Sequence, residues 1–147
     1  MIQWLNVLMT TIFQWVHIGA AVIGVGGIGF LIIVLLPSLS VLSVEQRDLL
    51  ARAVMGRFRW VSWTAIVLLL VSGLYNVKLV WEAPWGTYWR LLTVKVTLAL
   101  LVFAISLALT LPLNFLERFR ARRRMWLTLA FALALIVILV SAYLRRA

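Results

Sequence analysis

Four long apolar runs divide the chain, with short polar connections between them. The runs cover residues 9–36, 58–81, 88–111 and 125–144, and each is long enough to cross a hydrocarbon layer of roughly 30 Å as a helix. No run alternates with the period of two that a membrane β-barrel needs. Because backbone inside lipid must satisfy its own hydrogen bonds, each run is predicted to be a helix. The pattern predicts an all-α integral membrane protein built as a four-transmembrane-helix bundle.

The first connection, residues 38–57, is the longest. It follows Pro37, which is expected to end the first helix. Ser43 and Gln46 have the spacing of a capping box, and the apolar stripe after them predicts a short amphipathic helix at the membrane interface. This helix is either separate from the second span or continuous with it past Gly56.

The other two connections are shorter. Residues 82–87 are predicted to form a tight turn, and residues 116–124, which follow Pro112, are strongly basic. Residues 1–6 carry no Lys or Arg, and the apolar run after them is too long for a signal peptide, so a retained helix is predicted there. Because so little chain lies outside the runs, residues 1–147 are expected to form one membrane domain.

Composition and charge add an orientation to this picture. The 147 residues are 65% hydrophobic, more than one soluble core can hide, so the excess must face lipid or other membrane subunits. A formal net charge of +10 would suggest nucleic acid for a soluble protein, but here the basic residues lie between apolar runs, and we reject that partner. Arginines concentrate in the first and third connections. The positive-inside rule therefore places these connections in the cytoplasm and both termini outside, in the inner (plasma) membrane of the cell.

Two ionisable side chains lie clearly inside the apolar runs, His17 in the first and Lys95 in the third. Such residues are costly in lipid and tend to be functional. At 1.5 Å per residue both lie roughly 8–9 Å below the outer ends of their helices. We predict a site there, with His17 as a ligand of haem iron or copper and Lys95 paired with a haem propionate or another acidic group. The alternative is that His17 hydrogen-bonds a neighbouring helix and Lys95 extends to the interface.

Small residues follow His17 along the first helix. Gly24 and Gly27 lie on the His17 face, where a strip of bare backbone would suit a flat macrocycle. Alternatively, they simply allow close helix packing. The chain has no cysteine, one histidine and four methionines, a thin ligand set for a copper pathway. Haem b needs one or two axial ligands, so one His per protomer suffices and a homodimer would supply a second.

Several short motifs resemble the CopD-like membrane domain of copper-resistance proteins. These motifs are His17 followed by Gly26-Gly27, Phe30 and Pro37; Arg57-Phe58-Arg59; Ser72-Gly73; and Gly86 followed by Leu91-Leu92 and Lys95. The resemblance implies a multi-pass membrane protein that handles copper or binds haem b at an outer-leaflet site. Gly24 stands where that family usually has Trp, a change that opens space beside His17.

The helix layout is also similar to that of the HemJ-like protoporphyrinogen oxidases, which share a first-helix His and a third-helix Lys, here His17 and Lys95. That resemblance implies bound haem b and oxidation of a porphyrinogen. Residues 36–39 lack the Pro-Arg-Leu usual there, and the family's additional His is absent, so this enzyme ranks second. No catalytic residue is predicted. A third hypothesis is a non-catalytic accessory subunit of a larger membrane complex, because so little of the chain leaves the membrane.

Overall fold

The computed structural model describes residues 1–111 and 113–146, so Pro112, expected near the end of the third run, lies outside the described residues. Within them, four helices are long and apolar enough to cross a membrane, which confirms the predicted all-α architecture. The elements are α1 (Ile2–Phe30), η1 (Leu31–Leu35), α2 (Leu36–Ser38), η2 (Leu39–Val41), α3 (Val44–Leu79), α4 (Thr87–Thr110), η3 (Asn114–Leu116), α5 (Glu117–Ala121) and α6 (Arg123–Leu144).

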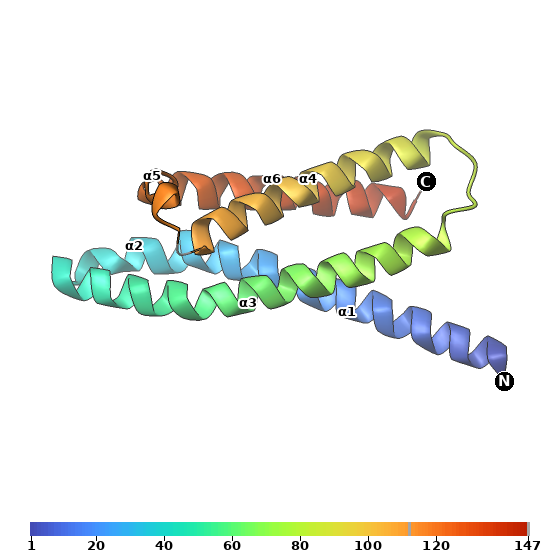
Figure 1. Ribbon diagram of the computed structural model, residues 1–147, viewed down its shortest axis with the longest axis horizontal. Helices are drawn as coiled ribbons and strands as arrows, with labels where there is room; N and C mark the ends of the chain where they lie inside the picture. Colours follow the sequence, from blue (N-terminus) through green and yellow to red (C-terminus); the bar gives the residue numbers. More distant parts are fainter. Residues whose placement is uncertain (112, 147) are drawn as a thin grey trace.

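The long helices form two pairs, with α1 packed along α3 and α4 packed along α6 (Figure 1). Contacts between the pairs, α1 with α6 and α3 with α4, are much sparser. Figure 1 shows both termini at the same end as the connection formed by residues 80–86, which we call the turn end. The opposite end, with residues 42–59 and 113–124, is called the arginine end.

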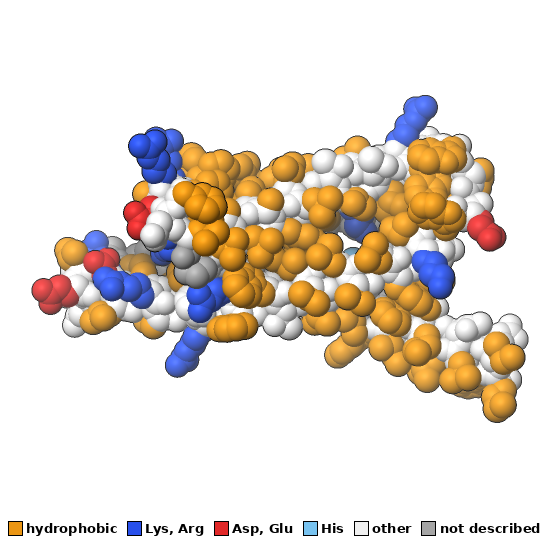
Figure 2. Space-filling view, viewed as in Figure 1, with side chains coloured by type: hydrophobic (Ala, Val, Ile, Leu, Met, Phe, Trp, Pro, Cys, Tyr) orange, Lys and Arg blue, Asp and Glu red, His pale blue; other side chains and the backbone are white. Residues whose placement is uncertain are grey.

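The apolar core lies nearer the arginine end. It is formed by Ile28, Leu31, Val102, Ile105, Leu109, Leu127, Ala130 and Ala134. These residues come from α1, η1, α4 and α6, so the core joins α1 to the α4–α6 pair. Towards the turn end, Figure 2 shows the surface hollowed between the two pairs, with a Lys or Arg side chain inside the hollow. The bundle is therefore closed at one end and open between its pairs at the other.

The prediction that Pro37 ends the first helix is wrong. Helical backbone continues through α2 and η2 to Val41, giving a helix of 40 residues and about 60 Å. Proline has no N–H for the carbonyl one turn back, and the turn before it widens to a π-helix in which the Leu36 N–H bonds to Leu31 O. The helix also begins earlier than predicted, and residues 2–9 are all exposed and project at the turn end (Figure 1).

The predicted capping box at the start of α3 is confirmed. Ser43 Oγ accepts a hydrogen bond from Gln46 N at 3.4 Å, and Ser43 N donates to Gln46 Oε1 at 3.2 Å. The amphipathic stretch after it is helical and runs through Gly56 into the second span as one helix of 36 residues. A single glycine weakens a helix by only about 1 kcal/mol relative to alanine, which packing against α1 offsets.

Glycines of α1 let its neighbours approach closely. A Cβ built on Gly29 would lie 2.9 Å from Phe131 Cε2 of α6, well inside van der Waals contact. Gly29 is buried, whereas Gly26 on the same helix is exposed and a Cβ there would meet nothing within 4 Å. Glycine at position 29 is thus required by the α1–α6 contact that joins the two helix pairs.

We therefore expect Gly29→Leu to destabilise the protein by about 1–3 kcal/mol through overpacking, and Gly26→Leu to leave stability nearly unchanged. Thermal unfolding of the two purified variants in the same detergent, followed by circular dichroism, measures the difference. Equal midpoints for the two variants would show that the α1–α6 contact does not depend on glycine.

Candidate functional site

His17 bonds to the neighbouring helix. Its Nδ1 atom lies 2.7 Å from Ser72 Oγ, which connects α1 to α3 across 55 positions of the chain. Ser72 is only 1% exposed, so the bond is shielded from competing polar groups. The alternative in which His17 hydrogen-bonds a neighbouring helix is therefore present in the structure, but it uses only one of the two ring nitrogens.

The surroundings of Ser72 fix which nitrogen carries the proton. The Ser72 hydroxyl has a single proton, and it donates this proton to Leu68 O, one turn earlier in α3, at 2.5 Å. Oγ must then accept from His17, so the neutral imidazole is protonated on Nδ1. Its lone pair is left on Nε2, the arrangement in which histidines bind metal through one nitrogen while the other N–H is held by a hydrogen bond.

The Nε2 atom remains open. It has no hydrogen-bond partner among the described residues, and it is not among the side-chain atoms that protein atoms enclose completely. Gly73, the next residue of α3, lies beside the ring, and a Cβ there would be 3.7 Å from His17 Cε1, an ordinary van der Waals contact. Ser72 therefore orients the ring, and Gly73 packs against it.

Lys95 of α4 is brought to the same region, as the equal depths predicted. Lys95 and Arg145, just beyond α6, are the charged groups close enough to act electrostatically on the His17 ring. Lys95 is half-buried, and no hydrogen-bond partner holds its ammonium group among the described residues. The open edge of the imidazole thus lies in a region whose charge is positive.

The chain supplies no carboxylate to neutralise this charge from the neighbouring helix turns. Its four acids are Glu45 and Asp48 at the start of α3, Glu82 in the turn and Glu117 in α5. None of them lies in α1, α4 or α6, the helices that carry or flank His17, Lys95 and Arg145. A bound group with carboxylates would supply the missing negative charge.

The predicted glycine strip lies against α3 at Gly24 and Gly27. A Cβ on Gly24 would lie 3.6 Å from Ala65 Cβ, and one on Gly27 would lie 2.8 Å from Phe58 Cε2. Both contacts come from α3, so these two glycines serve the close α1–α3 packing that was the alternative interpretation. The binding of a macrocycle along this strip stays a prediction, and the site argued below consists of His17, Lys95 and Arg145.

Ser72 and Arg145 are the parts of the site that sequence reasoning missed as functional groups. Ser72 stood in the Ser72-Gly73 motif, but its partner lies on another helix and no local pattern identifies it. Tyr75 of α3 stacks on Phe13 of α1 with ring centroids 4.1 Å apart, and this pair belongs to the α1–α3 contact. Within the part of the chain that the structure describes, no group of three or more His, Cys, Asp or Glu side chains is placed to hold a metal ion.

Comparison with known proteins adds no further assignment, because no protein family, curated protein or solved structure matches the chain. The resemblances to the CopD-like and HemJ-like families therefore stay predictions. The arguments below rest on the residues of the site.

Ser72→Ala should destabilise the protein by about 0.5–1.5 kcal/mol, because it removes an interhelical hydrogen bond. Ser141→Ala is the matched control, since Ser141 Oγ bonds only to Val137 O of its own helix. Unfolding in detergent of single variants and of the double variant with His17→Ala measures the coupling. If Ser72→Ala costs the same with and without His17, the two side chains are not coupled as described.

Proposed function

We propose that this membrane protein binds haem b, which His17 would hold through its Nε2 atom. The observation that carries the proposal is the hydrogen bond between His17 Nδ1 and Ser72 Oγ, which leaves the Nε2 lone pair open. A haem protein typically uses one neutral imidazole in this way, with the second nitrogen held by a partner. When bound, haem would supply redox or ligand-binding chemistry that the chain's own side chains lack.

The charges around His17 support the same ligand. Haem b carries two propionates, and Lys95 with Arg145 gives the site two cations without a neighbouring acid. Figure 2 shows the surface hollowed between the helix pairs towards the turn end. A planar group between the pairs would also cover apolar side chains that otherwise face lipid.

Copper, the other ligand implied by the CopD-like resemblance, is supported less well. A copper site needs several soft or imidazole ligands, and the chain has one His, no Cys and four Met. Of these, Met9 is 50% exposed on the projecting part of α1. Porphyrinogen oxidation by a HemJ-like mechanism is a narrower proposal that requires bound haem first. In an accessory subunit, residues 2–9 of α1 would be the surface that packs against another membrane protein, because the described chain leaves them exposed.

We further propose that the arginine end faces the cytoplasm of the plasma membrane. The positive-inside rule supports this orientation, because Arg47, Arg52, Arg57 and Arg59 and the five arginines of residues 118–124 all lie at one end. The site at His17 then opens towards the outer leaflet, and both termini lie outside.

The test is the visible spectrum and metal content of the protein purified in mild detergent from cells supplied with haem precursors. We expect a Soret band that His17→Ala abolishes and Lys95→Gln weakens, with Lys78→Gln as a control because Lys78 is exposed. A colourless protein containing copper removed by His17→Ala would support the copper alternative. A preparation without haem or copper would contradict a cofactor function at this site.

A further inference from the structure

A second cluster of cations lies at the arginine end, far along the helices from His17. Arg52 and Arg59 of α3, Arg120 of α5 and Arg123 of α6 line one hollow of ≈ 180 Å³. This is smaller than the roughly 300–1,000 Å³ of pockets that hold drug-sized ligands. Four arginine residues from three helices thus line a space suited to a small group.

The backbone between the α3 arginines leaves this hollow free. Arg52 and Arg59 are seven positions apart, two helical turns, and lie on one face of α3. Gly56 lies between them in the lining, and a Cβ there would meet nothing within 4 Å. Gly56 therefore leaves space between the two arginines, next to Met55, which also lines the hollow.

Arg59 is held in place from two sides. Its guanidinium carbon lies 5.7 Å from the centroid of the Trp60 ring and 5.8 Å from that of Trp63. The Trp63 indole in turn donates to Thr110 Oγ1 of α4 at 2.9 Å. Arg120 is also fixed, because its Nη2 donates to Leu113 O at 2.9 Å. At least two of the four cations are thus ordered before any ligand arrives.

Three of the arginines carry buried donors without acceptors. The Nε atoms of Arg59, Arg120 and Arg123 are enclosed by protein and have no hydrogen-bond partner among the described residues. Burying a polar group of a charged side chain without a partner is unfavourable, and gathering four like charges adds repulsion. The nearest acids along the chain, Asp48 and Glu117, do not line the hollow. The cluster therefore needs a negatively charged group, and the residues that line the hollow do not supply one.

We propose that these four arginines bind a phosphate group. Planar guanidinium groups match phosphate oxygens with paired, charge-assisted hydrogen bonds, which is why arginine predominates in phosphate recognition. The phosphate has two sources with the same chemistry, the headgroup of an anionic phospholipid and free inorganic phosphate. The position of the hollow, where α3, α5 and α6 meet at the end of the bundle, is accessible to either.

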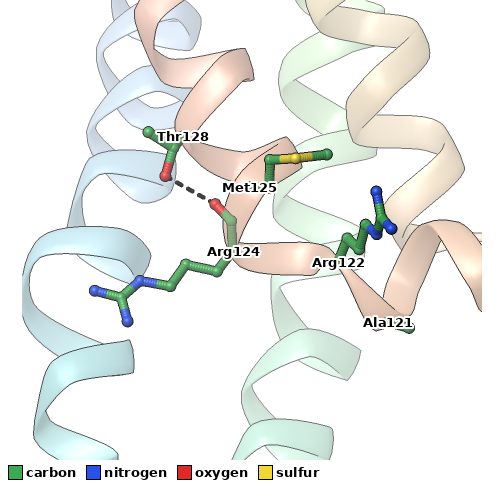
Figure 3. A pocket seen from close by; sticks show the side chains of 5 residues that line it. All are labelled: Ala121, Arg122, Arg124, Met125 and Thr128. Carbon is green, nitrogen blue, oxygen red and sulfur yellow. Dashed lines mark hydrogen bonds between the residues drawn. The ribbon is translucent and has the colours of Figure 1, made fainter.

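A neighbouring hollow provides the control. It is larger, ≈ 580 Å³, and is lined by Ala121, Arg122, Arg124, Met125 and Thr128. Figure 3 shows that the Arg122 and Arg124 side chains point away from each other, so they do not converge on one group. Substitution of this pair removes the same charge from the same end of the molecule without touching the four-arginine hollow.

The experiment compares Arg59→Gln/Arg123→Gln with Arg122→Gln/Arg124→Gln in delipidated, detergent-purified protein. Native mass spectrometry measures retention of phosphatidylglycerol against phosphatidylcholine, and ³¹P line broadening measures binding of inorganic phosphate. We expect the first variant to bind roughly tenfold to a hundredfold more weakly than wild type, and the control to stay within about twofold. Phosphatidylglycerol retention without phosphate binding identifies a lipid site, and phosphate binding without lipid identifies a free-anion site.

Equal losses in the two variants would overturn the proposal, because binding would then follow overall charge. So would wild-type protein that retains neither phosphatidylglycerol nor phosphate. Arg123→Lys is a second variant that guards against loss of binding through misfolding. It keeps the positive charge and removes only the planar guanidinium group. We expect it to fold as wild type by circular dichroism and to bind more weakly, and unchanged binding would contradict recognition by guanidinium geometry.

Discussion

The close approach of α1 to its neighbours is the constraint on which the rest of this bundle depends. Without Cβ atoms at Gly27 and Gly29, Phe58 of α3 and Phe131 of α6 can lie directly against the α1 backbone. The same approach along α3 brings His17 within hydrogen-bond distance of Ser72. Lipid surrounds both helices and gives no hydrophobic drive for them to associate, so packing and this polar bond must hold them together.

The two ends of the bundle consequently differ in how tightly their helices pack. Near the arginine end, the core between α1, α4 and α6 closes the structure, and arginines from α3, α5 and α6 surround a small hollow beside it. Towards the turn end the surface is hollowed between the pairs (Figure 2), and the costly polar groups of the spans, His17 and Lys95, lie close enough to interact. The lining of the hollow and the immediate surroundings of His17 contain cations and no acid, so each is suited to an anionic group, a tetrapyrrole carboxylate beside His17 and a phosphate in the hollow.

Much of the fold can be predicted from the sequence, because a segment that crosses lipid must be apolar, long enough to span it and helical. Hydropathy predicts the spans, the Ser43–Gln46 spacing predicts the cap of α3, and helix parity predicts that His17 and Lys95 reach one level. What sequence reasoning could not supply depends on residues distant along the chain. The α3 side chains that pack against Gly24 and Gly27, and the Ser72 partner of His17, come from another helix and have no local pattern. The π-turn before Pro37 is local, but a proline by itself does not indicate whether a helix ends there or widens and continues.

The most direct test of this account is the protonation of the His17 ring. His17 is the only histidine in the chain, so selective ¹⁵N-histidine labelling reports one side chain without assignment. In ligand-free protein at neutral to alkaline pH, the account predicts a directly bonded proton on Nδ1 and none on Nε2, with Ser72→Ala removing this preference. A proton found on Nε2 in the wild-type protein would contradict the account, because the nitrogen assigned to the ligand would not be free.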